Sequence, residues 1–208
     1  ALSSLVLKYK KDVTLYNMHY EFKNININVY DNFIFFSYNL FAMFDHIWTN
    51  LEVICRPIVF DVTTGEIVAR GMNKFFNYNE VEATKIENLQ AILGDASMKC
   101  EVGEKIDGTL ILVWKYKNKI YASSKGAMNT VQGIWAYEHF IRNYSSDLVP
   151  EGVTLFFEAV YPDNRLDSQL VIDYKNMQGL FFIGGRNNYG NEYSYATNKH
   201  LADVAAYQ

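Results

Sequence analysis

The sequence has few cysteines, few histidines and no long apolar run, and each shortage excludes a class of protein. Its two cysteines, Cys55 and Cys100, are too few for a disulfide scaffold and lack the paired spacing of a zinc site. The four histidines show no metal-ligand spacing either. The longest apolar runs are strand-sized, far below the roughly 20 residues that span a bilayer. We therefore expect a cytoplasmic protein without a membrane segment, in the host cytoplasm if the source is viral.

An excess of positive charge is also missing. The chain has 19 Lys and Arg against 23 Asp and Glu, a net charge of -4. Neutralising many nucleic-acid phosphates requires clustered cations, so a protein that coats nucleic acid through charge alone is excluded, whereas a local basic pocket is not. Only three prolines occur in 208 residues, and no segment has the composition of a linker. We therefore expect one compact domain and a monomeric protein.

Aromatic and β-branched residues are abundant, and they gather in short runs. Hydrophobic residues make up 50% of the chain and aromatic residues 16%, enough for one substantial core. Runs of this kind, bounded by turn-forming residues, are typical of strands. The expected strands lie within 25–40, most clearly at 32–38, and at 53–62, 67–70, 97–103, 109–116, 119–124, 153–160, 169–174 and 180–184.

Two segments show the three-and-four spacing of an amphipathic helix. The clearer one runs from Thr130 to Tyr144, and the weaker one covers residues 79–93. Turn chemistry separates strands at residues 63–66, at Lys117-Asn118 and at Gly184-Gly185-Arg186-Asn187, where the arginine could approach a pocket. Many strands with two or three helices predict an α+β fold built around antiparallel sheet.

The element that suggests chemistry is a KxDG string, Lys105-Ile106-Asp107-Gly108, between two expected strands. A lysine at this position can project into a cleft, and the glycine lets the backbone turn tightly. Alone, the string is better explained as a strand-end lysine before an Asp-Gly turn. Other elements stand around it in chain order: Cys55-Arg56-Pro57-Ile58-Val59-Phe60, Gly71-Met72-Asn73-Lys74-Phe75-Phe76-Asn77, Ser124-Lys125-Gly126 and Phe156-Phe157-Glu158.

This ordered series resembles the bacteriophage tRNA-repair type of ATP-dependent RNA ligase, a family of covalent nucleotidyltransferases related to DNA ligases and capping enzymes. The resemblance begins near Phe36-Ser37-Tyr38-Asn39, continues through Tyr161-Pro162-Asp163-Asn164-Arg165 to Asp173-Tyr174, and covers roughly residues 33–186. It implies the adenylation domain of such an enzyme, with a nucleotidyltransferase (ATP-grasp-like ligase) fold of antiparallel sheets flanked by helices.

The resemblance also implies a reaction. Lys105 would take AMP from ATP as a covalent lysyl-adenylate and pass it to an RNA 5′-phosphate, from which a 3′-hydroxyl then displaces it. The implied cofactors are ATP and Mg²⁺, and the implied partner is RNA with 5′-phosphate and 3′-hydroxyl ends, tRNA among the candidates. An ordinary lysine has a pKa near 10.4, so only about one in a few thousand is neutral at pH 7. Burial and nearby cations reduce that penalty.

The same resemblance assigns roles around Lys105. Arg56, Lys74 and Lys125 would hold the triphosphate and the AMP phosphate, because cations there offset charge on the transferring group. Glu158 would serve the ribose or the divalent metal, and Asp107 would orient the site or reach the metal through water. The implied catalytic set is Lys105, Asp107 and Lys125; the implied cofactor-binding set is Arg56, Lys74, Lys105, Gly108, Lys125 and Glu158; the implied metal ligands are Glu158 and Asp107.

Each assignment has a structural alternative. Glu158 is either the outward residue of an edge strand or a buried group with a partner, and the alternation along its run favours the second. Lys125 also fits a surface lysine at a hairpin end. Phe75 and Phe76 fit the core, though one of them could border the nucleotide pocket. Arg165 either contacts phosphate or RNA or pairs with a neighbouring aspartate.

The chain departs from the family pattern in three places. Pro57 stands where the family has glycine, which removes an amide donor beside Arg56. The EGxV and terminal KxK elements expected after Glu158 are absent, so residues 1–208 are expected to form a single adenylation domain truncated before the last two motifs. Two other functions stay open: a non-catalytic nucleotide- or RNA-binding module, and a DNA ligase or capping-type nucleotidyltransferase.

Overall fold

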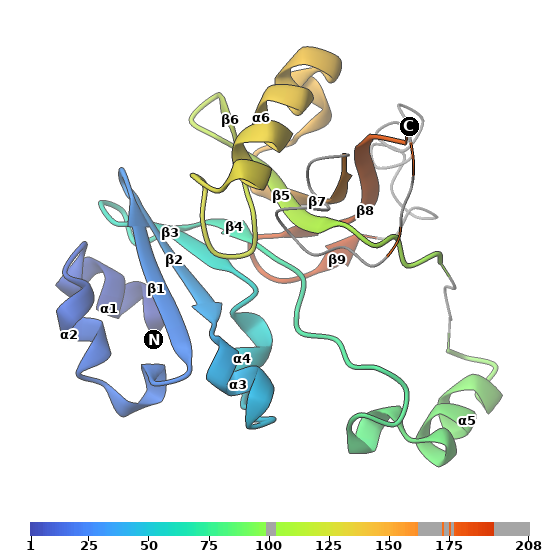
Figure 1. Ribbon diagram of the computed structural model, residues 1–208. Coiled ribbons are helices and arrows are strands. Elements are labelled where there is room, and N and C mark those ends of the chain that lie inside the picture. The colour runs from blue at the N-terminus through green and yellow to red at the C-terminus, as the bar shows by residue number, and fades with distance from the viewer. Residues whose placement is uncertain (99–102, 162–171, 173–174, 176, 194–208) are drawn as a thin grey trace.

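Two antiparallel sheets form the centre of the protein, as a computed structural model describes it for residues 1–98, 103–161, 172, 175 and 177–193 (Figure 1). The first sheet has the order β1-β2-β3-β4, with bounds Ile25–Tyr30, Phe33–Tyr38, Ile58–Asp61 and Ile67–Arg70. The second has the order β6-β5-β7-β8-β9, with bounds Lys119–Ser123, Thr109–Tyr116, Val153–Val160, Gly179–Asn187 and Glu192–Tyr193. The α+β class and the antiparallel sheets are therefore confirmed.

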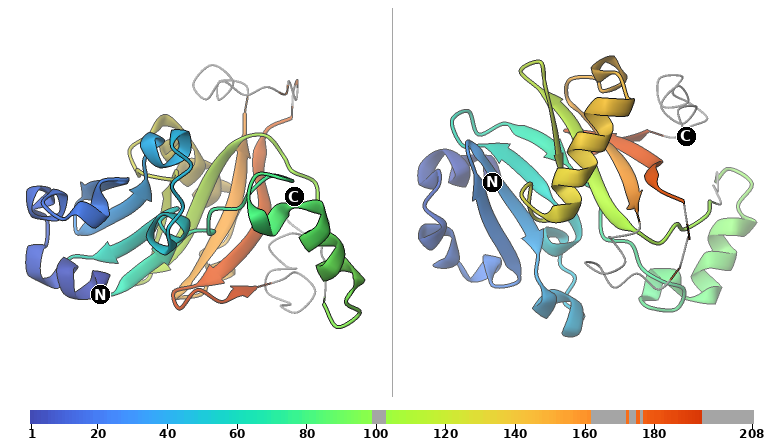
Figure 2. Two further views of the ribbon diagram at one scale, coloured as in Figure 1. Left: turned by 90° about the horizontal axis from the view of Figure 1, so that it is seen from below. Right: turned by 45° about the horizontal axis from the view of Figure 1, so that its top comes forward.

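Helices near the N-terminus cover the outer face of the first sheet (Figures 1 and 2). They are α1 (Leu2–Tyr9), α2 (Val13–Asn17) and the 3-10 turn η1 (Tyr20–Phe22). Val6 and Tyr16 from these helices pack with Phe36 and Phe60 of the sheet. Because the opposite face packs against the second sheet, all six residues of β2 are buried, which explains its uninterrupted apolar run.

The two sheets pack against each other through aromatic side chains. Phe33 and Phe35 of β2 contact Trp114 of β5, with ring centroids 6.2 and 6.4 Å apart. Phe156 of β7 belongs to the same cluster. The edge-to-face geometry of these pairs adds a directional contribution to area burial, and the packing fixes one sheet relative to the other.

The second sheet carries helix α6 (Val131–Asn143) on its outer face, followed by the short η3 (Ser146–Leu148). Thr130 caps α6 by accepting a hydrogen bond from the Gly133 amide at 3.0 Å. The β5–β6 hairpin turns at Lys117 and Asn118, both with positive φ, as a tight two-residue turn requires. The predicted helix, this hairpin and the strand at 153–160 are confirmed.

The predicted strand at 53–62 is too long, because its first residues belong to a helix. The chain forms α3 (Leu40–Phe44) and α4 (Asn50–Ile54) before β3 begins at Ile58. The Glu52 side chain accepts a hydrogen bond from the Thr49 amide at 3.1 Å, which completes a capping box. This local cap outweighs the strand preference of the two β-branched residues that follow.

The predicted helix at 79–93 begins later than expected, after the turn η2 (Glu82–Thr84), as α5 (Ile86–Gly94). No residue of α5 is buried, and the helix stands away from the sheets (Figure 1). The strand expected at 97–103 is wrong at its start. Asp95 accepts hydrogen bonds from the Ser97 amide and hydroxyl, at 2.9 and 2.7 Å, which makes a turn. Residues 99–102 lie outside the described part.

The turn predicted at residues 184–187 is also wrong. Strand β8 continues to Asn187, and Gly184, with φ +151°, lies where the pairing with β7 shifts register. The glycines therefore accommodate a bulge within a strand rather than ending it. The strand predicted at 169–174 lies outside the described residues, apart from Ile172, and so does the segment with Arg165.

We predict that Phe157→Ala lowers the free energy of unfolding by about 3–5 kcal/mol, because the ring is fully buried between β7 and α6. Urea denaturation followed by circular dichroism measures the change. The control is Ile141→Ala on the exposed face of α6, which should stay within about 0.5 kcal/mol of the parent. Equal losses in the two variants would contradict this packing.

Candidate active site

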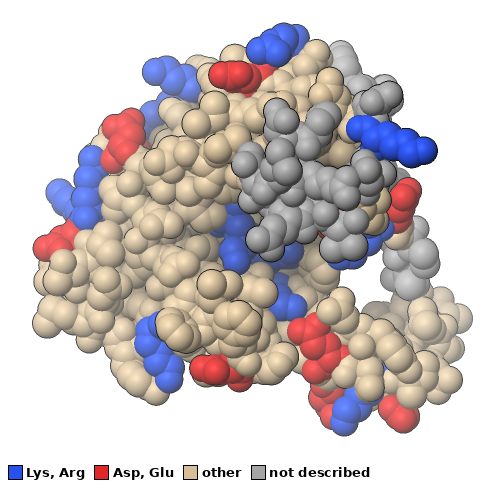
Figure 3. All heavy atoms as spheres, viewed as in Figure 1, with Lys and Arg blue, Asp and Glu red and all other residues tan. Residues whose placement is uncertain are grey.

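A cavity of about 360 Å³ opens between the two sheets. Residues beside the first sheet form one wall, and residues of the KxDG segment and the second sheet form the other. In the orientation of Figure 1, Lys and Arg side chains gather in a central hollow (Figure 3). The cavity is lined by Arg56, Met72, Phe75, Glu104, Lys105, Ile106, Gly108, Leu110, Glu158 and Ile183.

Lys105 belongs to an irregular segment that leads into β5. Residues 103–108 form neither helix nor strand, and Lys105 is exposed while it lines the cavity. Its amine is therefore accessible from solvent and lies beside the carboxyl group of Glu158, whose pKa its positive charge lowers. This arrangement leaves the amine available to a ligand in the cavity.

Glu158 lies in a central strand, so the alternative of an outward residue on an edge strand is excluded. It is opposite Leu110 of β5 and Phe181 of β8. Burial raises the pKa of its carboxyl group to about 7, although Lys105, Arg56 and a hydrogen bond from the Gly108 amide lower it. A carboxylate that changes charge near neutral pH inside a cavity is a feature of functional sites.

Gly108 has no room for a side chain. A Cβ atom at this position would lie 2.5 Å from the Ala159 carbonyl oxygen and 2.8 Å from Cγ of Glu158. The KxDG backbone therefore lies directly against strand β7. Glycine is needed here for close approach, and the contact brings Lys105 and Glu158 to the same wall of the cavity.

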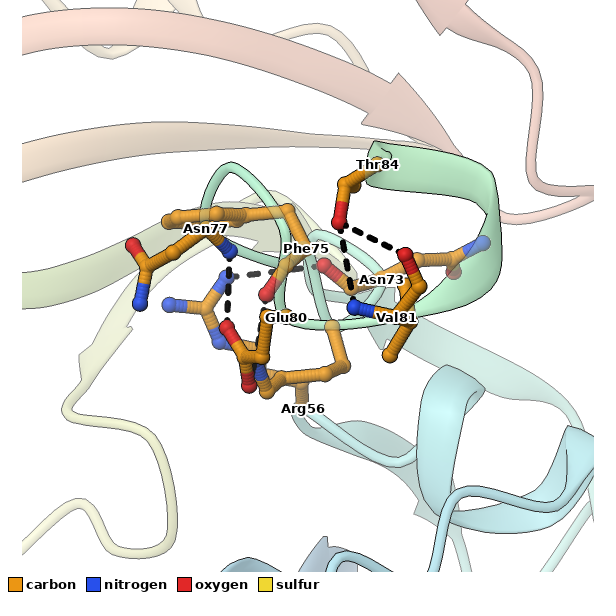
Figure 4. Close-up of polar contacts among 8 residues, drawn as sticks. Arg56, Asn73, Phe75, Asn77, Glu80, Val81 and Thr84 are labelled. Atoms are coloured by element: carbon orange, nitrogen blue, oxygen red, sulfur yellow. Dashed lines mark hydrogen bonds and ion pairs between the residues drawn. The ribbon is translucent and has the colours of Figure 1, made fainter. Parts of the chain in front are cut away.

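Arg56 follows α4 and reaches the cavity from the first sheet (Figure 4). Its Nη1 atom donates a hydrogen bond to the Asn73 carbonyl oxygen at 3.4 Å, and its guanidinium lies 4.5 Å from the centroid of the Phe75 ring. The ring and the carbonyl fix the plane of the guanidinium, and cation–π contact adds to this. Phe75 thus borders the pocket, one of the two positions left open for it by the sequence.

Lys125 lies at the end of the β5–β6 hairpin, which contacts the first sheet. Asn28 Nδ2 donates to the Gly126 carbonyl oxygen at 2.9 Å, and Lys125 Nζ lies 3.8 Å from the centroid of the Tyr38 ring. Burial and, to a smaller extent, the positive charge of Arg56 together lower the pKa of Lys125 to about 8. Lys125 is therefore a half-buried cation near Arg56 rather than an ordinary surface lysine.

Neither Lys74 nor Asp107 is among the residues that line the cavity, and both side chains have contacts elsewhere. Lys74 Nζ lies 3.5 Å from Glu80 Oε1 and 4.2 Å from the centroid of the Phe76 ring. Asp107 Oδ2 accepts a hydrogen bond from the Ile172 amide at 3.1 Å. Of the residues singled out from the sequence, the structure brings together Arg56, Lys105, Gly108 and Glu158 around one cavity, with Lys125 close to Arg56.

No group of three or more His, Cys, Asp or Glu side chains within the described residues is arranged to hold a metal ion by itself. Glu158 lines the cavity and Asp107 belongs to the KxDG segment, and the charge of Asp107 raises the pKa of Glu158. A divalent ion held by these two carboxylates would take further oxygen ligands, such as water or a bound molecule.

Sequence reasoning missed Tyr38 as a site residue. It lies beneath Lys125 and also contacts Trp48, with ring centroids 5.2 Å apart. Its place in the Phe36-Ser37-Tyr38-Asn39 string was the available signal. The string was used for the resemblance, but nothing in it indicated which side chain faces the hairpin of the second sheet.

Comparison with known proteins identifies the class. A family model described as RNA ligase matches residues 54–207, which include every cavity-lining residue. This match covers well over half of the chain, and the protein belongs to the RNA ligase family. The membership accords with a lysine-containing pocket between two antiparallel sheets.

One relative is the putative bifunctional polynucleotide kinase/RNA ligase of Autographa californica nuclear polyhedrosis virus. It is 25% identical to this chain over 164 residues, which cover 70% of this chain and 23% of the viral protein. The chain therefore spans about a quarter of the length of this curated relative. None of the described helices combines the length and apolar character that crossing a membrane requires.

We predict that Gly108→Ala disrupts the cavity, because the new methyl group would collide with strand β7 and Glu158. The free energy of unfolding should fall by about 1–3 kcal/mol, and urea denaturation measures the change. Gly103→Ala is the matched control, since nothing lies within 4 Å of its added Cβ. Equal stability of Gly108→Ala and the parent protein would contradict the close contact.

We predict opposite pH dependences of stability from Glu158 and Lys125. In the unfolded chain these groups titrate near pH 4.3 and 10.4, whereas in the folded protein their pKa values are about 7 and about 8. Between about pH 4.3 and 7 the folded protein binds more protons at Glu158, so the free energy of unfolding falls as pH rises. Between about pH 8 and 10.4 the unfolded chain binds more protons at Lys125, so the free energy of unfolding rises.

Urea denaturation at a series of pH values tests this prediction. Glu158→Gln should flatten the acid-side slope and leave the alkaline slope, whereas Lys125→Met should do the reverse. If either variant keeps the parent slope in its own pH range, the corresponding group does not titrate as described.

Proposed function

We propose that this chain carries the adenylation site of an ATP-dependent RNA ligase and that its two sheets form a covalent nucleotidyltransferase fold. Lys105 Nζ attacks the α-phosphorus of ATP, so that an N–P bond forms, the bond to the β-phosphate oxygen breaks and pyrophosphate leaves. The attacking amine gives up its proton to solvent. AMP then passes to an RNA 5′-phosphate, and attack by a 3′-hydroxyl seals the strand and releases AMP.

The observation that carries this proposal is the convergence of Lys105, Arg56 and Glu158 on one cavity. A nucleophile needs an open approach to its target, and Lys105 is exposed where it lines that cavity. Phosphoryl transfer depends mainly on positioning and on compensating charge at the phosphate oxygens. Arg56 is a fixed cation on the opposite wall, which suits this role.

Lys125 supports the same assignment as a second cation. The positive charge of Arg56 lowers the pKa of Lys125, so the two cations repel each other. Binding an anionic phosphate there would relieve the repulsion between them. We assign Arg56 and Lys125 to the phosphates of ATP, and Lys74, which is now paired with Glu80, to the outer end of the triphosphate.

The carboxylates fit a Mg²⁺ ion that arrives with ATP. Mg²⁺ commonly takes one or two carboxylates together with substrate phosphates, and Glu158 and Asp107 offer that donor set. The ion would screen negative charge on the phosphates. Glu158 would contribute its carboxylate form, which requires loss of the proton that burial retains up to about pH 7. Asp107 would bind the ion from the KxDG segment.

We assign RNA as the nucleic acid on the strength of the family. The viral relative is named as a polynucleotide kinase/RNA ligase, a combination that would prepare a 5′-phosphate before sealing. RNA with 5′-phosphate and 3′-hydroxyl ends is therefore the proposed substrate.

We predict that the protein, incubated with Mg²⁺ and ATP radiolabelled at its α-phosphate, retains label on Lys105. Lys105→Ala should lower labelling at least about a hundredfold. Lys105→Arg should do the same, because arginine keeps the charge but cannot supply a neutral nucleophile. Lys119→Ala, at an exposed strand end, is the control that should label normally.

Other outcomes would identify a different function. Label on Lys105→Arg would make residue 105 a phosphate-binding cation rather than the nucleophile. Absence of label on the parent protein, with ATP still bound, would indicate a non-catalytic nucleotide-binding module. Labelling from GTP instead, or transfer of AMP to DNA ends in preference to RNA, would indicate a capping-type enzyme or a DNA ligase.

A further inference from the structure

Arg186 is a buried cation that the proposed reaction does not use. It lies in β8 and is only 3% exposed. Its Nη1 atom donates to the Gly71 carbonyl oxygen at 3.3 Å and to Asn73 Oδ1 at 2.5 Å, and its Nη2 atom pairs with Glu192 of β9. Burying a guanidinium costs free energy unless its N–H groups have hydrogen-bond partners. The partners of Arg186 therefore indicate which groups it positions.

Two of those partners, Gly71 and Asn73, flank Met72, which lines the cavity on the side of the first sheet. Gly71 to Asn73 directly follow β4, and the next residues bring Phe75 over Arg56. Arg56 donates to the carbonyl oxygen of the same Asn73 whose side chain Arg186 holds. Asn73 therefore accepts hydrogen bonds from both sides of the cavity. Its side chain accepts from Arg186, and its backbone carbonyl oxygen accepts from Arg56.

The backbones of Gly71 and Arg56 are in close contact. A Cβ on Gly71 would lie 2.1 Å from the Arg56 carbonyl oxygen, so the two backbone segments touch. A shift of residues 71–73 would therefore move Arg56 as well, because close-packed segments transmit displacement. The position of the Arg56 guanidinium in the cavity thus depends on how residues 71–73 are anchored.

We propose that Arg186 is a positioning residue of the nucleotide site: it anchors residues 71–73 to the second sheet and thereby sets Arg56 and Phe75 opposite Lys105. The inference rests on the proposed function. Arginine suits the role because its planar fork reaches a backbone oxygen, a side-chain oxygen and a carboxylate at once. A lysine at this position would lose the fork and could not hold these three partners in the same geometry.

The test measures adenylation of the parent protein and of Arg186→Lys as a function of ATP concentration. We expect Arg186→Lys to raise the KM for ATP at least about tenfold while the rate at saturating ATP changes less than about threefold, since Lys105 itself is untouched. Asn73→Ala should have the same effect. Combining the two should add little, because Arg186 acts through Asn73.

The matched control is Asn188→Ala. Asn188 follows the same strand and donates to the Ile67 carbonyl oxygen at 2.6 Å, so it also connects the two sheets, but away from residues 71–75. It should lower the melting temperature and leave the KM for ATP unchanged. An unchanged KM in Arg186→Lys, or an equal rise in Asn188→Ala, would reduce Arg186 to a stabilising role and overturn the proposal. A parent protein that takes no label would instead overturn the proposed function on which it rests.

Discussion

The site depends on one constraint, the packing of the two sheets on each other. One wall of the cavity comes from residues beside the first sheet and the other from the KxDG segment and the second sheet. Neither wall carries both Arg56 and Lys105. The aromatic cluster around Trp114 sets the distance between the sheets, and polar contacts adjust their relative position. Those contacts include the Arg70 amide to Thr154 Oγ1 at 2.9 Å and Tyr116 Oη to Asp61 Oδ2 at 2.8 Å. A shift of one sheet against the other would therefore move Arg56 relative to Lys105.

The charges of the site contrast with those of the whole chain. The protein is acidic overall, with a net charge of -4, yet Arg56 and Lys105 line the cavity between its sheets and Lys125 lies close to Arg56. Figure 3 shows Lys and Arg side chains in a central hollow of this face. Such an arrangement lowers stability when nothing is bound, because like charges repel and buried groups lose solvation. A phosphate ligand would remove that cost. In the proposed function, this local gathering of cations is what lets an acidic protein bind an anionic phosphate at one place.

Periodicity predicted much of the second half of the described fold well, because several of its elements are long. The helix from Thr130, the hairpin at Lys117-Asn118 and the inward direction of Glu158 all follow from local patterns. The short N-terminal helices escaped prediction because five to eight residues carry little periodic signal. The grouping of Arg56, Lys105 and Glu158 was suggested only by a resemblance, since residues far apart in sequence meet through sheet packing. Arg186 was misread as part of a turn because its partners, Gly71 and Asn73, are distant in the chain.

The match to the RNA ligase family begins at residue 54, at the end of α4, whereas the first sheet begins at Ile25. Strands β1 and β2 thus fall outside the region of recognisable similarity and yet pair with β3 inside it. A protein trimmed to the matched range would leave Phe60 without its aromatic neighbour Phe36 and would expose the hydrogen-bonding edge of β3 to solvent. It would also lose Tyr38, the ring on which Lys125 rests. Strands β1 and β2 are therefore part of the folded unit that holds the site, although the family match begins only at residue 54.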